Sequence, residues 1–214
     1  MSIRQYRPRN NRRRGISANQ SMGLYFLFAL AIGLQISYPL VSGDALRYVT
    51  IFFVISGALL MLVHSFLSYG FKYFAIFGCT TFIFALLVEI LGSKTGWPFG
   101  TYSYADSLGF KVAGVPVIVP FAWIMMAHPV LIAARKTFPS WAFLYGGAGL
   151  MVWDLFLDPQ MVAAGRWTWE VTGASFPYAP EIPLSNAFGW LLSGLTLIAI
   201  LHFILPTARR KEAP

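Results

Sequence analysis

The sequence predicts an all-α membrane protein, a polytopic bundle of about six transmembrane helices with both termini in the cytoplasm. Hydrophobic residues make up 57% of the 214 residues and charged residues only 11%, whereas soluble domains carry about 25% charged residues. The apolar residues gather into six long runs, and the basic residues are distributed unevenly between the connections. The chain is long enough for six spans, because each needs roughly 20 residues.

Each predicted helix corresponds to an apolar run that can cross, or nearly cross, a bilayer with its backbone hydrogen bonds closed internally. The runs cover approximately residues 22–41, 46–67, 72–92, 115–134, 140–157 and 184–205. Two connections are longer than the others, 93–114 and 159–183, and both are rich in Gly, Pro, Trp and Tyr. We expect these two connections to be ordered loops at the membrane interface.

Basic residues orient the bundle, because cytoplasmic connections are enriched in Lys and Arg. With a cytoplasmic N-terminus, twelve of the sixteen basic residues lie inside and four lie outside. Six of the twelve inside residues fall within the first fourteen positions. The predicted organisation is a basic N-terminal tail, a transmembrane domain and a basic C-terminal tail, residues 1–20, 21–206 and 207–214. A bacterial cytoplasmic membrane is the expected location. The net charge of +8 then reflects orientation and anionic lipid rather than nucleic acid binding.

Glu89 lies in an apolar stretch near the outer end of the third predicted span. A carboxyl inside a membrane segment is costly and by default indicates a functional site or a buried pair. Burial disfavours the ionised form, and a carboxyl that keeps its proton at neutral pH is what a general acid requires. The alternative is an interfacial residue paired with Lys94 or Lys111.

Asp154 and Asp158 are spaced by four residues near the end of the fifth predicted span. This spacing puts both carboxylates on one helical face. Two like charges in a low-dielectric site do not both ionise cheaply, so the pair supplies an acid beside a base. One alternative is a Mg²⁺ site. Another is structural, with Asp158 as the N-cap of a short helix that has Pro159 at its first position.

Aromatic residues crowd the two long connections, on the same predicted side of the membrane as these acids. Aromatic faces stabilise a nearby cation and form the walls of apolar pockets. The alternative is the belt of Trp and Tyr found at membrane interfaces. The aromatic residues concerned are Trp97, Phe99, Tyr102, Tyr104, Trp167 and Trp169.

The histidines and the small residues carry weaker signals. His64, His128 and His202 show no ligand spacing with a second His or Cys, so no metal site is predicted. The run of small residues at 146–149 predicts close packing of the fifth span on a neighbouring helix.

Four blocks of sequence resemble the carotenoid biosynthesis membrane family. This family includes carotenoid 1,2-hydratases, such as the γ-carotene 1′-hydroxylase and bisanhydrobacterioruberin hydratase types. The blocks are Glu89 with 96–104, then 108–123, 154–169 and 183–190. The resemblance implies addition of water across the terminal C1–C2 double bond of an acyclic carotenoid ψ-end group, which gives a tertiary alcohol. No cofactor is expected, since hydration is redox-neutral.

Protonation of such an alkene gives a tertiary carbocation, which needs a buried acid, an aromatic pocket and a positioned water. Asp154 or Asp158 is the expected proton donor, with its partner or Glu89 positioning the water. The residues expected to line the substrate pocket are Trp97, Phe99, Tyr102, Tyr104, Trp123, Arg166, Trp167, Trp169, Asn186 and Trp190. The expected partners are a carotenoid substrate, membrane lipid and other membrane enzymes of the same pathway.

Three other functions compete with hydration. A carotenoid end-group cyclase would begin with the same protonation. A Mg²⁺-dependent prenyltransferase would need a second acidic motif and more basic residues than the four on the outer face. A non-catalytic lipid or pigment carrier often shows internal repeats, and the sequence shows none. Product mass separates these classes, because hydration adds one water and cyclisation leaves the mass unchanged.

Overall fold

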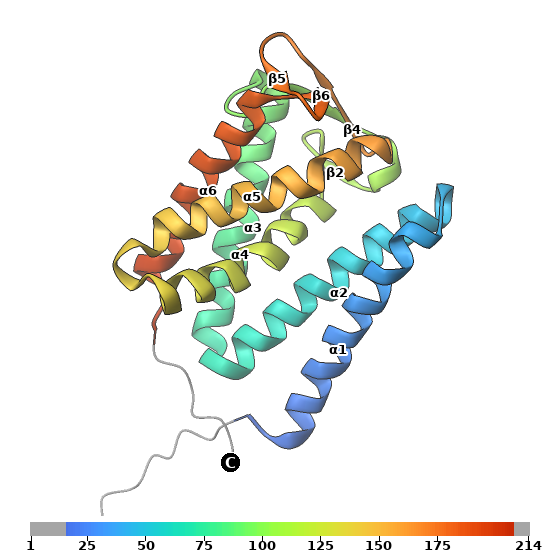
Figure 1. The fold of residues 1–214 in the computed structure, drawn as a ribbon. Coiled ribbons are helices and arrows are strands. Elements are labelled where there is room, and N and C mark those ends of the chain that lie inside the picture. The colour runs from blue at the N-terminus through green and yellow to red at the C-terminus, as the bar shows by residue number, and fades with distance from the viewer. Residues whose placement is uncertain (1–15, 208–214) are drawn as a thin grey trace, which may run out of the picture.

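The computed structural model describes residues 16–207. Within this range six helices are long and apolar enough to cross a membrane, which confirms the predicted number of spans. They are α1 (Ala18–Ser37), α2 (Gly43–Tyr69), α3 (Phe71–Thr95), α4 (Ile118–Thr137), α5 (Ala142–Ala163) and α6 (Leu184–Ile204) (Figure 1). Most of the two predicted basic tails lies outside the described residues, and the cytoplasmic placement of the termini stays a prediction.

The ends of α1 and α5 have identifiable local causes. Ser17 caps α1, because its hydroxyl accepts from the Gln20 backbone while the Gln20 side chain accepts from the Ser17 backbone. α5 continues past the predicted end at 157 to Ala163, with Pro159 inside the helix. Membrane helices tolerate an internal proline. The alternative that Asp158 caps a new helix is therefore wrong.

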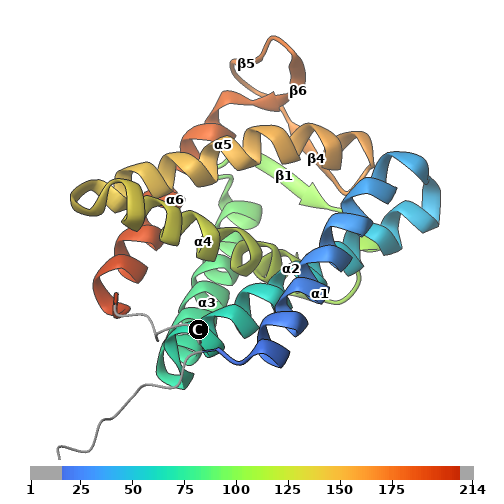
Figure 2. The ribbon, with the colours of Figure 1, turned by 60° about the horizontal axis from the view of Figure 1, so that its bottom comes forward.

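The helices form two flanks around a centre. α1 and α2 lie on one side of α3 and α4, and α6 lies on the other, in both views (Figures 1 and 2). α2 packs on α4, and α4 on α5, while α5 packs most extensively on α6. α4 thus connects α5 to the α1–α2 hairpin.

Small residues let α5 and α6 approach closely, as the run at 146–149 predicts. A Cβ atom added to Gly147 would lie 2.6 Å from the backbone nitrogen of Leu195. A Cβ on Gly194 would lie 2.9 Å from the carbonyl oxygen of Gly147. The α5–α6 contact therefore depends on glycine from both helices.

The two long connections are ordered, but they contain strands, which the sequence did not predict. β1 (Thr101–Tyr104) pairs antiparallel with β4 (Trp167–Glu170), and the pair lies beneath one end of α5 (Figure 2). Tyr102 faces Trp169, and Tyr104 faces Trp167. Because alternate strand residues share a face, all four aromatic side chains lie on one side of this ladder.

Shorter elements complete the connections. Two further antiparallel pairs join β2 (Lys111–Val112) to β3 (Val115–Pro116) and β5 (Ser175–Phe176) to β6 (Ala179–Pro183). Short 3-10 helices cover Tyr38–Leu40, Asp106–Leu108 and Pro139–Trp141.

Candidate active site

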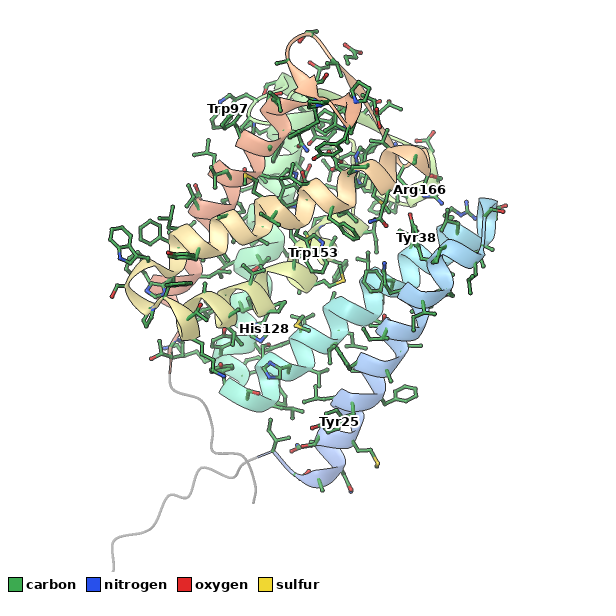
Figure 3. All side chains as sticks on the ribbon, in the orientation of Figure 1. Tyr25, Tyr38, Trp97, His128, Trp153 and Arg166 are labelled. Carbon is green, nitrogen blue, oxygen red and sulfur yellow. The ribbon has the colours of Figure 1, made fainter. Side chains whose placement is uncertain are left out.

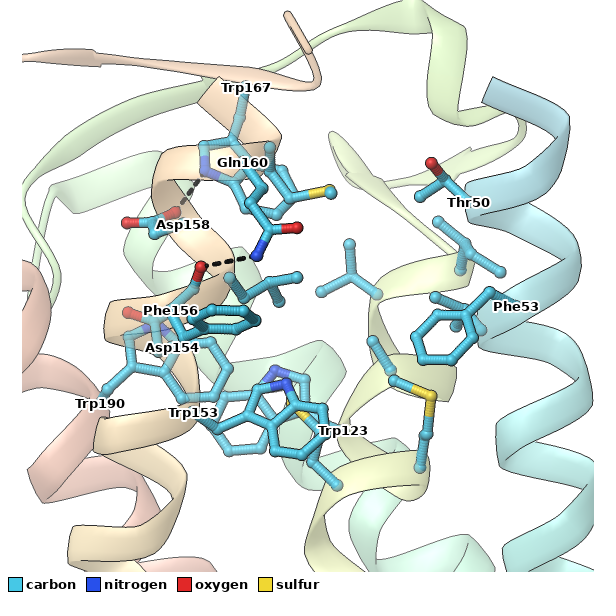
Figure 4. A pocket seen from close by; sticks show the side chains of 18 of the residues that line it. Thr50, Phe53, Trp123, Trp153, Asp154, Phe156, Asp158, Gln160, Trp167 and Trp190 are labelled. Atoms are coloured by element: carbon cyan, nitrogen blue, oxygen red, sulfur yellow. Dashed lines mark hydrogen bonds between the residues drawn. The ribbon is translucent and has the colours of Figure 1, made fainter. Parts of the chain in front are cut away.

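A cavity of about 680 Å³ lies between α5 and the α1–α2 hairpin, with α4 contributing a third wall. Figure 4 shows the α5 side chains on one side and Thr50 and Phe53 of α2 opposite. This volume falls within the range of ligand-binding pockets. The three acids singled out in the sequence, Glu89, Asp154 and Asp158, all line this cavity. Their exposed fractions are only 2–3%.

Asp154 and Asp158 are joined by one amide from α6. The Asn186 Nδ2 group donates to Asp154 Oδ2 at 2.7 Å and to Asp158 Oδ2 at 2.6 Å. The indole nitrogen of Trp167 on β4 donates to Asp158 Oδ1 at 2.5 Å (Figure 4). Asn186 Oδ1 is buried and has no hydrogen-bond partner. The two carboxyls on one helical face thus form a pair held by donors from two other elements.

Glu89 on α3 is surrounded by donors. Its Oε2 atom accepts from the hydroxyls of Tyr102 at 2.6 Å and Tyr104 at 2.7 Å. Its Oε1 atom accepts from the indole nitrogen of Trp123 on α4 at 3.1 Å. Both oxygens therefore act as acceptors, which is the arrangement that suits a carboxylate.

The structure contradicts the alternative in which Glu89 pairs with a lysine. Lys111 instead lies 2.7 Å from Asp106 Oδ1 and donates to the backbone carbonyl of Tyr104 at 2.8 Å. The hydrogen bond and charge of Lys111 lower the pKa of the exposed Asp106 carboxyl. This ion pair lies in the connection outside the bundle and helps to fix the end of β1.

The two tyrosines beside Glu89 remain hydrogen-bond donors at physiological pH. Burial raises the pKa of the Tyr102 hydroxyl, and the nearby Glu89 charge raises it further. The same two causes raise the pKa of Tyr104 well above its ordinary value. A phenol that holds its proton is a fixed donor, so the β1 strand supplies two permanent hydrogen bonds to one carboxylate oxygen.

Aromatic rings form the remaining walls around Glu89, Asp154 and Asp158, the part of the cavity that we call the acid end. Trp123 and Trp190 stack with their ring centroids 4.4 Å apart, and Tyr102 lies against Trp169 at 4.8 Å. Eight residues of the predicted pocket line the cavity: Phe99, Tyr102, Tyr104, Trp123, Trp167, Trp169, Asn186 and Trp190. Aromatic faces next to carboxylates stabilise positive charge from more than one side.

Two residues of the predicted pocket, Trp97 and Arg166, do not line the cavity. Trp97 is 58% exposed on the outer surface (Figure 3). Gly96 ends α3 in the left-handed conformation with φ of 76°, and the chain turns so that Phe99, at 2% exposure, fills the interior instead. Arg166 is buried and donates to Ser107 Oγ at 3.3 Å. Its contact is with the connection after β1 rather than with the cavity.

The N-terminal helices contribute lining residues that the sequence reasoning did not identify. They are Ile32, Gln35, Tyr38, Thr50, Phe53 and Val54. An apolar span carries no mark that distinguishes a cavity wall from a lipid-facing surface. The polar side chains within these spans were the only available signal.

A second polar contact, between His64 and His128, also escaped the sequence reasoning. The His64 Nδ1 and His128 Nε2 atoms lie 2.9 Å apart, and Ser68 Oγ lies 3.2 Å from His64 Nε2. Neither histidine lines the cavity. Across residues 16–207, no three or more His, Cys, Asp or Glu side chains are grouped so that they could hold a metal ion.

Six helices that can span a membrane, together with a cavity lined by carboxyls and aromatic rings, define a multi-pass membrane protein. The sequence profile of the family described as "carotenoid biosynthesis protein" matches residues 49–213, so the chain belongs to that family. A curated relative, the bisanhydrobacterioruberin hydratase of Haloarcula japonica, is 33% identical over 123 residues. The match covers 54% of this chain and 40% of the relative's length. No solved structure matches the chain.

Proposed function

We propose that this protein is a cofactor-independent carotenoid hydratase that adds water across the terminal C1–C2 double bond of an acyclic ψ-end group. Family membership and the name of the relative support a hydratase-type role. The observation that carries the proposal is the buried Asp154–Asp158 pair, bridged by one amide and facing the same cavity as Glu89. An acid that protonates an alkene has to be kept out of bulk water, and this pair is 2% exposed.

The hydrogen-bond pattern supports Asp154, rather than Asp158, as the proton donor. Asn186 donates to the Oδ2 atoms of both aspartates, and Trp167 donates to Asp158 Oδ1. Among the described residues, no donor is directed at Asp154 Oδ1. Since two adjacent carboxyls share one proton more readily than they both ionise, Asp154 Oδ1 is the oxygen with room to carry it.

The reaction then proceeds in two balanced steps. The alkene π electrons take the Asp154 proton, forming a C2–H bond and leaving a tertiary cation at C1. A water oxygen bonds to C1, and the proton that the water releases returns to the aspartate pair. Asp158 positions this water as the base of the pair. The product is a tertiary alcohol, with no net change in the protonation of the site.

Glu89 and the aromatic rings stabilise the intermediate cation. The Glu89 carboxylate is fixed by Tyr102, Tyr104 and Trp123, so its charge needs no reorganisation when the cation forms. The stacked rings of Trp123 and Trp190 present an aromatic face in the same cavity. Such preorganised charge is worth more in a water-excluded site than in solution.

The test is pigment analysis in a host that accumulates an acyclic carotenoid, with variants matched for expression. The wild-type protein should add the mass of one water for each modified end. Asp154→Asn keeps the shape but removes the acid, and should lower product formation by about 10²–10⁴-fold. Trp97→Phe, outside the cavity, is the matched control and should behave as wild type. Undiminished product from Asp154→Asn would refute the assignment.

The same measurement separates the competing functions. A product of unchanged mass with altered absorption would indicate end-group cyclisation, which begins with the same protonation. Pigment that is retained by the wild-type protein but unchanged in structure would indicate a binding or carrier protein.

A further inference from the structure

The exposure of the cavity walls changes from one end of the cavity to the other. At the acid end, Trp123 and Asp154 are 0% and 2% exposed. Where the cavity passes between α1 and α5, residues that line it are exposed, with Ile32 at 44%, Val152 at 59% and Phe156 at 71%. The cavity is therefore closed around the acids and open between α1 and α5.

The open end is formed by apolar side chains on two membrane-spanning helices. Ile32 belongs to α1, and Val152, Trp153 and Phe156 belong to α5. Gln35 is the one exposed polar residue among the lining residues of these two helices. Both helices are long and apolar enough to span the bilayer. The opening therefore faces lipid acyl chains, because a mouth built from spanning segments lies at the depth of the hydrocarbon core.

Packing leaves this opening unsealed. α1 packs on α2, while α5 packs on α4 and α6. The side chains of Trp153 and Phe156 lie on the α5 side of the cavity and Phe53 on the α2 side (Figure 4). The result is a slot with an aromatic wall that runs from the bilayer to the carboxyl pair.

We propose that the slot between α1 and α5 is a lateral binding site for the extended chain of a linear polyene. The substrate enters from the bilayer with its terminal double bond leading, and the rest of its chain stays between the two helices during the reaction. This inference rests on the proposed function. It identifies the part of the protein that binds the polyene chain behind the reacting end group.

A conjugated polyene fits this slot better than the acyl chain of a lipid. A saturated chain loses rotational freedom when a narrow slot immobilises it, whereas a conjugated chain is already stiff and loses less. The slot is also continuous with the acids, so a chain that lies in it delivers its end group to Asp154. A saturated chain has no double bond for that acid to protonate.

The test narrows the slot from both sides and compares two substrates. The double variant Ile32→Trp/Val152→Trp adds bulk at the mouth without altering any residue assigned to the chemistry. Leu30→Trp/Leu144→Trp is the matched control, since both positions are exposed on the same helices, at 42% and 43%, and neither lines the cavity. The substrates are a full-length acyclic carotenoid and a short acyclic isoprenoid with the same end group.

The mouth variant should lower kcat/KM for the full-length carotenoid by about tenfold or more. For the short isoprenoid, which fits within the acid end, the change should stay within about twofold. The control variant should leave both substrates unaffected. Equal losses for both substrates, or no loss for the carotenoid, would overturn the proposal.

A binding measurement separates this inference from the proposed function. In an Asp154→Asn background, the amount of carotenoid that co-purifies with the protein should fall when the mouth is narrowed, whether or not the wild type hydrates it. Removing the wall with Val152→Ala/Phe156→Ala should lower retention without adding bulk. Retention equal to the parent in both mouth variants, or retention that saturated lipid displaces completely, would show that the slot holds no polyene.

Discussion

The side-chain nitrogen of Asn186 lies 2.7 Å from Oδ2 of Asp154 and 2.6 Å from Oδ2 of Asp158, and it donates a hydrogen bond to each. One neutral side chain near the start of α6 thus holds two carboxyls one turn apart on α5. The glycines at the α5–α6 contact allow this distance, so the packing of the two helices also positions the acid pair.

Asn186→Leu should separate positioning from folding. Leucine has a similar size but donates no hydrogen bond, so two buried acceptors lose their shared partner. We expect kcat to fall by about 10–100-fold with little change in KM, and stability to fall by about 1–3 kcal/mol. Thr196→Ala, at an exposed position on α6, is the control. A wild-type kcat in Asn186→Leu would contradict the role given to the bridge.

Tyr102 and Tyr104 should make the protein lose stability in alkali. Burial and Glu89 raise their pKa values above the ordinary 10.0 in the folded state. Below about pH 10 both states hold the phenolic protons, so the tyrosines give no pH dependence there. Above it the unfolded chain releases protons that the folded one keeps, and stability falls as pH rises. Denaturant unfolding of Tyr102→Phe and Tyr104→Phe from pH 7 to 11 should show a shallower decline than wild type.

Gly147→Ala should destabilise the α5–α6 contact. The new methyl group would lie 2.6 Å from the backbone nitrogen of Leu195, which cannot move as a flexible side chain would. Overpacking of this kind costs about 1–3 kcal/mol. Gly33→Ala on α1, where nothing lies within 4 Å, should be neutral or slightly stabilising. Thermal unfolding in detergent compares the two variants, and equal stabilities would show that α6 can shift to admit the methyl group.

The histidine pair should behave as a coupled unit. His64→Leu removes the partner of the His128 Nε2 atom, in a residue that is 1% exposed. We expect this single variant to lose about 1–3 kcal/mol, and His64→Leu/His128→Leu to recover part of the loss, since both polar partners are then gone. Hydration should be unchanged, because neither residue lines the cavity. Strictly additive losses in the double-mutant cycle would contradict the coupling.

The helices could be read from the sequence because the length of an apolar run is a local property. The four-residue spacing of Asp154 and Asp158 likewise predicted a shared face, and the structure keeps them on one. The end of α5 was missed because Pro159 was taken as a boundary, whereas it lies inside the helix.

What the sequence could not provide is the pairing of distant segments. β1 and β4 are separated by two spans, α4 and α5, and nothing in their short aromatic stretches indicates that they pair. The hydrogen bonds from Asn186 to the two aspartates depend on the α5–α6 packing. The burial of Phe99 rather than Trp97 depends on the left-handed turn at Gly96. Each of these is a tertiary relationship, fixed by contacts rather than by local pattern.

The cavity is closed around the acid pair, so one end of a substrate reaches the acids at a time. A carotenoid with two identical ends cannot present both to a single acid pair, so under the proposed reaction each end requires its own visit. After the first hydration the half-converted pigment is released into the lipid, and it has to bind the protein again with its other end leading. Time courses should therefore show the monohydroxylated carotenoid before the dihydroxylated one. A low protein concentration should leave the monohydroxylated form as the main pigment.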